Sequence, residues 1–175
     1  SMGNQGTANR GLREAAAVLK SGALGKIKEC HVFTDRPVWP QGGPRGKSQA
    51  VPESLDWNLW LGPAPLRPYA AGYHSFAWRG WWDFGTGALG DMACHIMDPV
   101  FRILPIDYPS SVECSVATIY KEMWNDYSNP DSCPPSSIMH LVYPRKNGKG
   151  EIKVSWHDGG LTPERPAELL PEEPM

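Results

Sequence analysis

Three polar side chains recur at helical spacing in the segment GALGDMACHIMDP, residues 87–99. Asp91, His95 and Asp98 stand four and three residues apart, so in a helix they form one narrow stripe opposite an apolar face. An aspartate four residues before a histidine can orient the imidazole and raise its proton affinity, as a general base requires. Asp91 and His95 are therefore candidate catalytic residues. The simpler interpretation is that the stripe is the solvent side of an amphipathic helix.

The residues just before this stripe favour the catalytic interpretation. Glycines at positions 85, 87 and 90 allow a backbone or a ligand to come close to the start of the helix. Several aromatic side chains directly upstream could form the walls of a cleft: Trp78, Trp81, Trp82 and Phe84.

Other motifs for chemistry are weak. The sequence DFG at 83–85 matches the magnesium motif of kinases, but the other kinase motifs are absent, so we treat it as a chance match. No Gly-x-Gly-x-x-Gly follows a predicted strand, and no Walker loop or nucleophile elbow is present. The cysteines at 30, 94, 114 and 133 lack zinc-ligand spacing, so we expect buried thiols without disulfides and no metal site.

Composition limits the class of protein. A length of 175 residues suits one domain, and eight tryptophans argue against disorder. The 18 glycines and 18 prolines predict long, ordered, irregular loops. The net charge of −2, with scattered lysine and arginine, gives little support to nucleic-acid binding. No apolar stretch approaches the roughly 20 residues of a membrane span.

The order of predicted elements is helix, strand, long loop, helix and then three strands. Thr7 or Asn9 can cap the first helix, and Gly22 can end it. Asn147-Gly148 is a hairpin turn signal between the last two strands. This order predicts an α+β fold with an open, largely antiparallel or mixed sheet and helices on one face. The elements are helices at 7–21, 55–61 and 86–104, and strands at 26–35, 111–121, 137–143 and 150–156.

Three longer segments resemble one family. They are GKIKECHVFTDRPVWPQG, LDWNLWLGPAPLRPY and YHSFAWRGWWDFGTGALGDMACHIMD. The chain resembles the C-terminal domain of the glucose–fructose oxidoreductase/inositol dehydrogenase (Gfo/Idh/MocA) family over most of residues 3–160. The phrase around Asp91 and His95 is the most specific part of the resemblance.

The resemblance implies an NAD(P)-dependent sugar or cyclitol dehydrogenase. In that family an N-terminal Rossmann domain holds NAD or NADP, and the C-terminal domain supplies the sheet, the substrate pocket and usually the oligomer interface. By resemblance, His95 removes the proton of a substrate hydroxyl, Asp91 binds a hydroxyl, and hydride passes to the nicotinamide. Asn4 and Gln5 are candidate cofactor contacts. The candidate substrate contacts are Arg36, Trp39, Tyr73, His74, Trp78, Arg79 and Trp82.

The chain departs from the family pattern in two respects. It lacks the Rossmann fingerprint and the Glu-Lys-Pro segment whose lysine completes the catalytic set. We therefore expect residues 1–175 to form a single partial domain that binds no NAD by itself and is inactive alone.

Two other functions stay open at this point. One is a glycosidase on the same scaffold, which uses bound NAD for transient oxidation. The other is a non-catalytic carbohydrate-binding or oligomerisation module. The expected partners are a sugar-like substrate and further copies of the chain, joined through the sheet; the expected compartment is the cytoplasm, or the periplasm if an export signal lies upstream.

Overall fold

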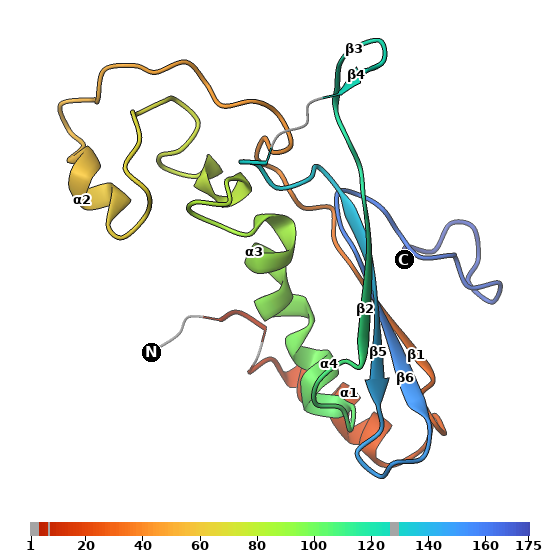
Figure 1. Ribbon diagram of the computed structural model, residues 1–175. Coiled ribbons are helices and arrows are strands. Elements are labelled where there is room, and N and C mark those ends of the chain that lie inside the picture. Colours follow the sequence, from red (N-terminus) through yellow and green to blue (C-terminus); the bar gives the residue numbers. More distant parts are fainter. Residues whose placement is uncertain (1–3, 7, 127–129) are drawn as a thin grey trace. The chain divides into compact units, whose positions relative to one another are not determined.

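The computed structural model describes residues 4–6, 8–126 and 130–175 (Figure 1). The chain forms two compact units, each built from segments that are distant in the sequence. The first unit comprises Ser1–Asp35, Cys94–Ser115 and Ser136–Met175, and the second comprises Arg36–Ala93 and Val116–Pro135.

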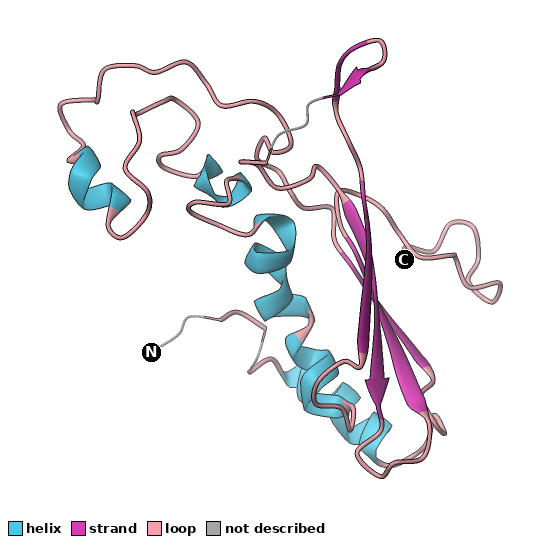
Figure 2. Ribbon diagram, in the orientation of Figure 1, coloured by secondary structure: helices cyan, strands magenta, loops and turns pink. Residues whose placement is uncertain are grey.

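The first unit contains a four-stranded mixed sheet with strand order β1-β6-β5-β2 (Figure 2). β1 runs parallel to β6, and β5 runs antiparallel to β6. This arrangement confirms the predicted α+β class and the open, mixed sheet. The elements are α1 (Arg10–Lys20), β1 (Glu29–Phe33), α4 (Asp98–Ile103), β2 (Ser111–Val116), β5 (Ser137–Pro144) and β6 (Glu151–His157).

β6 provides the centre of the core of this unit. Its alternate residues Ile152, Val154 and Trp156 point to one face of the sheet and are almost completely buried. On the same face, Tyr143 of β5 meets the ring of Phe101 from α4 edge-on, with 6.0 Å between the centroids. α4 also packs against α1, so the helices of this unit cover one face of the sheet (Figure 1).

Local signals in the sequence account for the ends of α1 and for the last hairpin. Asn9 caps α1 by accepting a hydrogen bond from the backbone N–H of Gly11, as predicted, whereas Thr7 lies outside the described residues. Between β5 and β6, Gly148 adopts a φ of 70° and donates its N–H to the carbonyl of Arg145. The Asn147-Gly148 hairpin is therefore confirmed.

The second unit consists largely of irregular loops held together by aromatic side chains. Tyr73 lies at its centre, stacked on Trp57 and edge-on to Trp81 and Phe84. The long loop predicted to be ordered is therefore ordered by ring packing rather than by backbone ladders. Its elements are α2 (Trp57–Leu61), the 3₁₀ helix η1 (Ala77–Gly80), β3 (Tyr120–Glu122) and β4 (Asn125–Asp126).

Two predicted elements are wrong in extent. The helix expected at 86–104 is divided into α3 (Gly87–Ile96), which begins in the second unit and ends in the first, and α4. Pro99 explains the break, because it has no N–H for the carbonyl of His95 and its ring crowds that carbonyl. The strand expected at 111–121 ends at Val116, and the short β3–β4 pair was not predicted.

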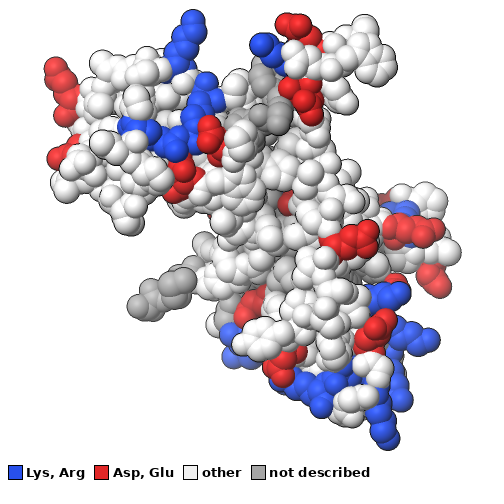
Figure 3. Space-filling model, viewed as in Figure 1, with Lys and Arg blue, Asp and Glu red and all other residues white. Residues whose placement is uncertain are grey.

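The four cysteines form no disulfide in the described part of the chain, but only Cys133 is buried, so the expectation of buried thiols fails for the exposed Cys94 and Cys114. Figure 3 shows basic side chains gathered at the lower end of the view, with acidic side chains among them.

Candidate functional site

The candidate residue Asp91 is held by Arg79. Its Oδ1 accepts a hydrogen bond from Arg79 Nε at 2.7 Å, and both side chains are partly buried in the second unit. Arg79 is fixed in turn, because its Nη1 donates to the carbonyl of Phe76 and its guanidinium lies over the rings of Phe76 and Trp78. Arg79, predicted to contact substrate, thus has a clear role in orienting a carboxylate.

The candidate base His95 stands in the last turn of α3, in the first unit, and is half-buried. Beside it in the sequence, the carbonyl of Cys94 accepts a hydrogen bond from Asn4 Nδ2 at 2.6 Å. Asn4, a predicted cofactor contact, therefore bonds to the backbone near the end of the helix that carries His95. Gln5, the other predicted cofactor contact, is exposed.

The space beside the glycines at the start of α3 is filled by other atoms of the protein. Residues 85–90 read Gly-Thr-Gly-Ala-Leu-Gly, a spacing that in dinucleotide-binding folds lets a pyrophosphate approach a helix. Here a Cβ on Gly85 would lie 2.7 Å from the carbonyl oxygen of Arg79, and one on Gly87 would lie 2.8 Å from Cys133 Cβ. The segment follows turns rather than a strand. These residues therefore do not fit a dinucleotide, and the glycines serve close packing.

An open pocket of about 770 Å³ lies in the second unit. Two of the predicted substrate contacts, Trp78 and Trp82, line it. Phe84, expected from the sequence to form a cleft wall, also lines it. Trp60, the Pro63–Pro65 segment and Asp83 line the pocket as well, and they were not among the candidate site residues.

The other predicted substrate contacts are placed differently. Trp39 and Tyr73 are buried; Trp39 Nε1 donates to Gln41 within the loop core, so these two rings support the loops. His74 is exposed and its ring meets Trp60 edge-on. Arg36 is half-buried. The structure thus gathers Trp78 and Trp82 in one pocket and leaves Trp39, Tyr73 and Arg36 outside it.

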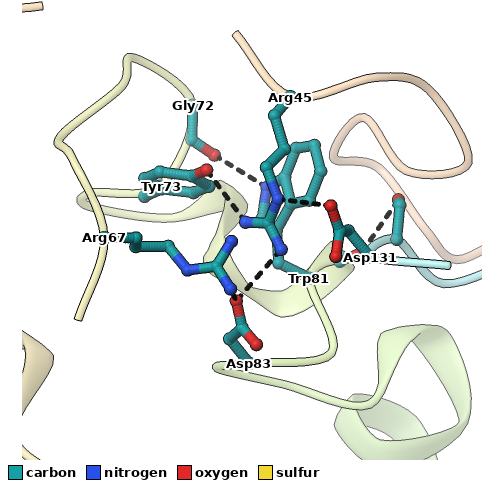
Figure 4. A network of polar contacts seen from close by, with 9 residues as sticks. Arg45, Arg67, Gly72, Tyr73, Trp81, Asp83 and Asp131 are labelled. Carbon is teal, nitrogen blue, oxygen red and sulfur yellow. Dashed lines mark hydrogen bonds and ion pairs between the residues drawn. The ribbon is translucent and has the colours of Figure 1, made fainter. Parts of the chain in front are cut away.

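A charged network beside the pocket was missed by sequence reasoning (Figure 4). Arg45 donates Nε to Asp131 at 2.8 Å, Nη1 to the Tyr73 hydroxyl at 3.0 Å and Nη2 to Asp83 Oδ2 at 3.0 Å. Arg67 pairs with the same Oδ2 of Asp83. The hydrogen bond from Arg45 holds the pKa of Asp131 below its ordinary value. Asp83, the first residue of the sequence DFG that we treat as a chance match to the kinase motif, thus lies at the centre of this network.

Among the residues that the structure describes, no group of three or more histidine, cysteine, aspartate or glutamate side chains is arranged to hold a metal ion. In the same part of the chain, no helix has the length and apolar character needed to cross a membrane.

Comparison with known families agrees with the fold and with the phrase around α3. Residues 12–125, more than half of the chain, match the Gfo/Idh/MocA oxidoreductase family, C-terminal alpha/beta domain. The chain belongs to this family, and the matched segment includes Asp91, His95 and the pocket. A search of curated proteins finds no match to the chain.

Proposed function

We propose that this chain is the substrate domain of an NAD(P)-dependent sugar or cyclitol dehydrogenase. The observation that carries the proposal is the position of Asp91 and His95 on α3, within the segment that matches the oxidoreductase family. The chain's own atoms fill the space beside the glycines at 85–90, where a pyrophosphate would have to approach. The cofactor NAD or NADP would therefore be held by a separate dinucleotide-binding domain. When bound there, it supplies the hydride acceptor.

The proposed roles of this chain concern the substrate and its proton. His95 Nε2 or Nδ1 accepts the proton of the substrate hydroxyl, since an unprotonated imidazole nitrogen can act as a general base. Asp91 accepts a hydrogen bond from a substrate hydroxyl, and its ion pair with Arg79 keeps the carboxylate in place. Asn4 steadies the end of α3 through the carbonyl of Cys94.

We also propose that copies of the chain associate through the sheet. β2 lies at one edge of the sheet, and all six of its residues are exposed. They include the apolar Val112 and Val116, which are unusual residues for a strand that stays in contact with water. The proposed compartment is the cytoplasm, with the periplasm as the alternative.

The experiment uses the complete enzyme with NAD⁺ or NADP⁺ and a panel of sugars, cyclitols and aryl glycosides. Net formation of reduced cofactor, followed by absorbance, is expected with a free sugar or cyclitol. Release of the aryl group without net reduction would instead identify an NAD-dependent glycosidase. Absence of both reactions across the panel would leave only the non-catalytic alternatives and overturn the proposal.

A further inference from the structure

The open pocket in the second unit has the chemistry of a carbohydrate-binding site. Indole and phenyl rings of Trp60, Trp78, Trp82 and Phe84 line it together with the Pro63–Pro65 segment. A volume of about 770 Å³ is in the range that accepts a small-molecule ligand. Trp82 is 50% exposed, so a flat aromatic surface is open to a ligand.

Asp83 gives this apolar pocket one oriented polar group. Both guanidinium groups that reach it, those of Arg45 and Arg67, bind its Oδ2. Its other oxygen, Oδ1, has no hydrogen-bond or ion-pair partner among the described residues. The carboxylate is therefore fixed in position with one acceptor atom left for a hydroxyl of a ligand.

The charge around the pocket selects a neutral ligand. Of the described residues that line it, Asp83 alone carries a charge, so an anion would meet a carboxylate and no lining cation. A ligand ammonium group would compete with Arg45 and Arg67, which already neutralise Asp83. A neutral ring with hydroxyls at its rim and C–H groups on its faces suits both the aromatic walls and the free Oδ1.

We propose that this pocket binds a neutral pyranose ring, stacked on Trp82 and hydrogen-bonded to Asp83 Oδ1. The choice of a sugar rests on the proposed function, but binding needs neither a nicotinamide nor His95. The pocket belongs entirely to the second unit. The chain would therefore hold a sugar through aromatic side chains of the second unit, independently of proton removal by His95.

The test is saturation-transfer NMR on the 175-residue chain with methyl β-D-glucopyranoside, whose axial C–H groups can stack on an indole. Saturation of the protein's aromatic protons is expected to reach the ring protons of the glucoside. Trp82→Ala is expected to weaken binding roughly fivefold to tenfold, because one ring stack is lost. Trp82→Phe keeps a stacking ring and is expected to restore most of the affinity.

Trp124→Ala is the matched control, because Trp124 is 91% exposed on the loop between β3 and β4, outside this pocket. It is expected to leave glucoside binding unchanged. Three results would overturn the proposal: no saturation transfer at millimolar glucoside, transfer that Trp82→Ala does not weaken, or tighter Trp82-dependent binding of tetramethylammonium than of the glucoside. Since no cofactor is present, these results are distinct from failure of the dehydrogenase assay.

Discussion

Arg45→Lys is expected to destabilise the second unit by about 2–4 kcal/mol. The Arg45 guanidinium donates hydrogen bonds to three side chains, and a lysine ammonium at this position can keep only one of them. Hydrogen bonds to charged groups contribute roughly 1.5–3 kcal/mol each, and a buried acceptor left without its donor adds to the loss. The bond to Asp131 counts for less, since that side chain is 48% exposed and screened by water. The loss therefore comes mainly from Tyr73 and Asp83, whose bonds are partly buried.

Urea unfolding followed by tryptophan fluorescence suits this measurement, because seven of the eight tryptophans lie in the second unit. Arg10→Lys is the control. Arg10 pairs with Glu14 along α1, and the two side chains are 85% and 61% exposed, so a change within about 0.5 kcal/mol is expected. If the two substitutions have equally small effects, the network is not what holds the loops together.

Three further outcomes are expected. Burial, and to a lesser extent the charges of His31 and His140, lower the pKa of His157 below its ordinary value. The unfolded chain therefore binds a proton at this histidine more readily than the folded chain does. The free energy of unfolding should therefore fall as the pH drops below about 6.5. His157→Gln should flatten this slope in denaturant titrations at several pH values, whereas His74→Gln should keep it. Gly87→Ala should cost about 2–4 kcal/mol, because φ is 63° and the new Cβ would meet Cys133, while Gly43→Ala, with open space, should change the unfolding midpoint little. Calorimetric titration of the 175-residue chain with NAD should show no binding at micromolar concentrations; measurable heat there would contradict the fit argued from the glycines.

The parts of the fold that were predictable depend on local signals. Asn9 and Gly22 limit α1, and Asn147-Gly148 fixes a hairpin, because caps and tight turns use only a few residue types. The break before α4 also has a local signal in Pro99. The apolar periodicity, which continues through residue 104, outweighed that signal and predicted one long helix.

The charged network could not be predicted in this way. Arg45, Arg67, Asp83 and Asp131 come from four separate stretches of irregular chain, and no period in the sequence relates them. Only the folded loops bring them together.

The aromatic residues present a different difficulty. Tyr73 and Trp82 are equally plausible as core or as pocket residues from their type alone. The structure buries Tyr73 and exposes half of Trp82. Sequence reasoning therefore identified a region rich in site residues without separating the residues that support it from those that face a ligand.

The proposed function requires that His95 removes a proton from the substrate. In the complete enzyme, His95→Gln should lower kcat by roughly 10²–10⁴-fold with little change in KM, as expected when a general base is lost. His140→Gln, on the exposed side of β5, should leave kcat unchanged. Steady-state kinetics of the two variants test this most directly: a selective loss with His95→Gln is predicted, and an unchanged kcat in that variant would contradict the account.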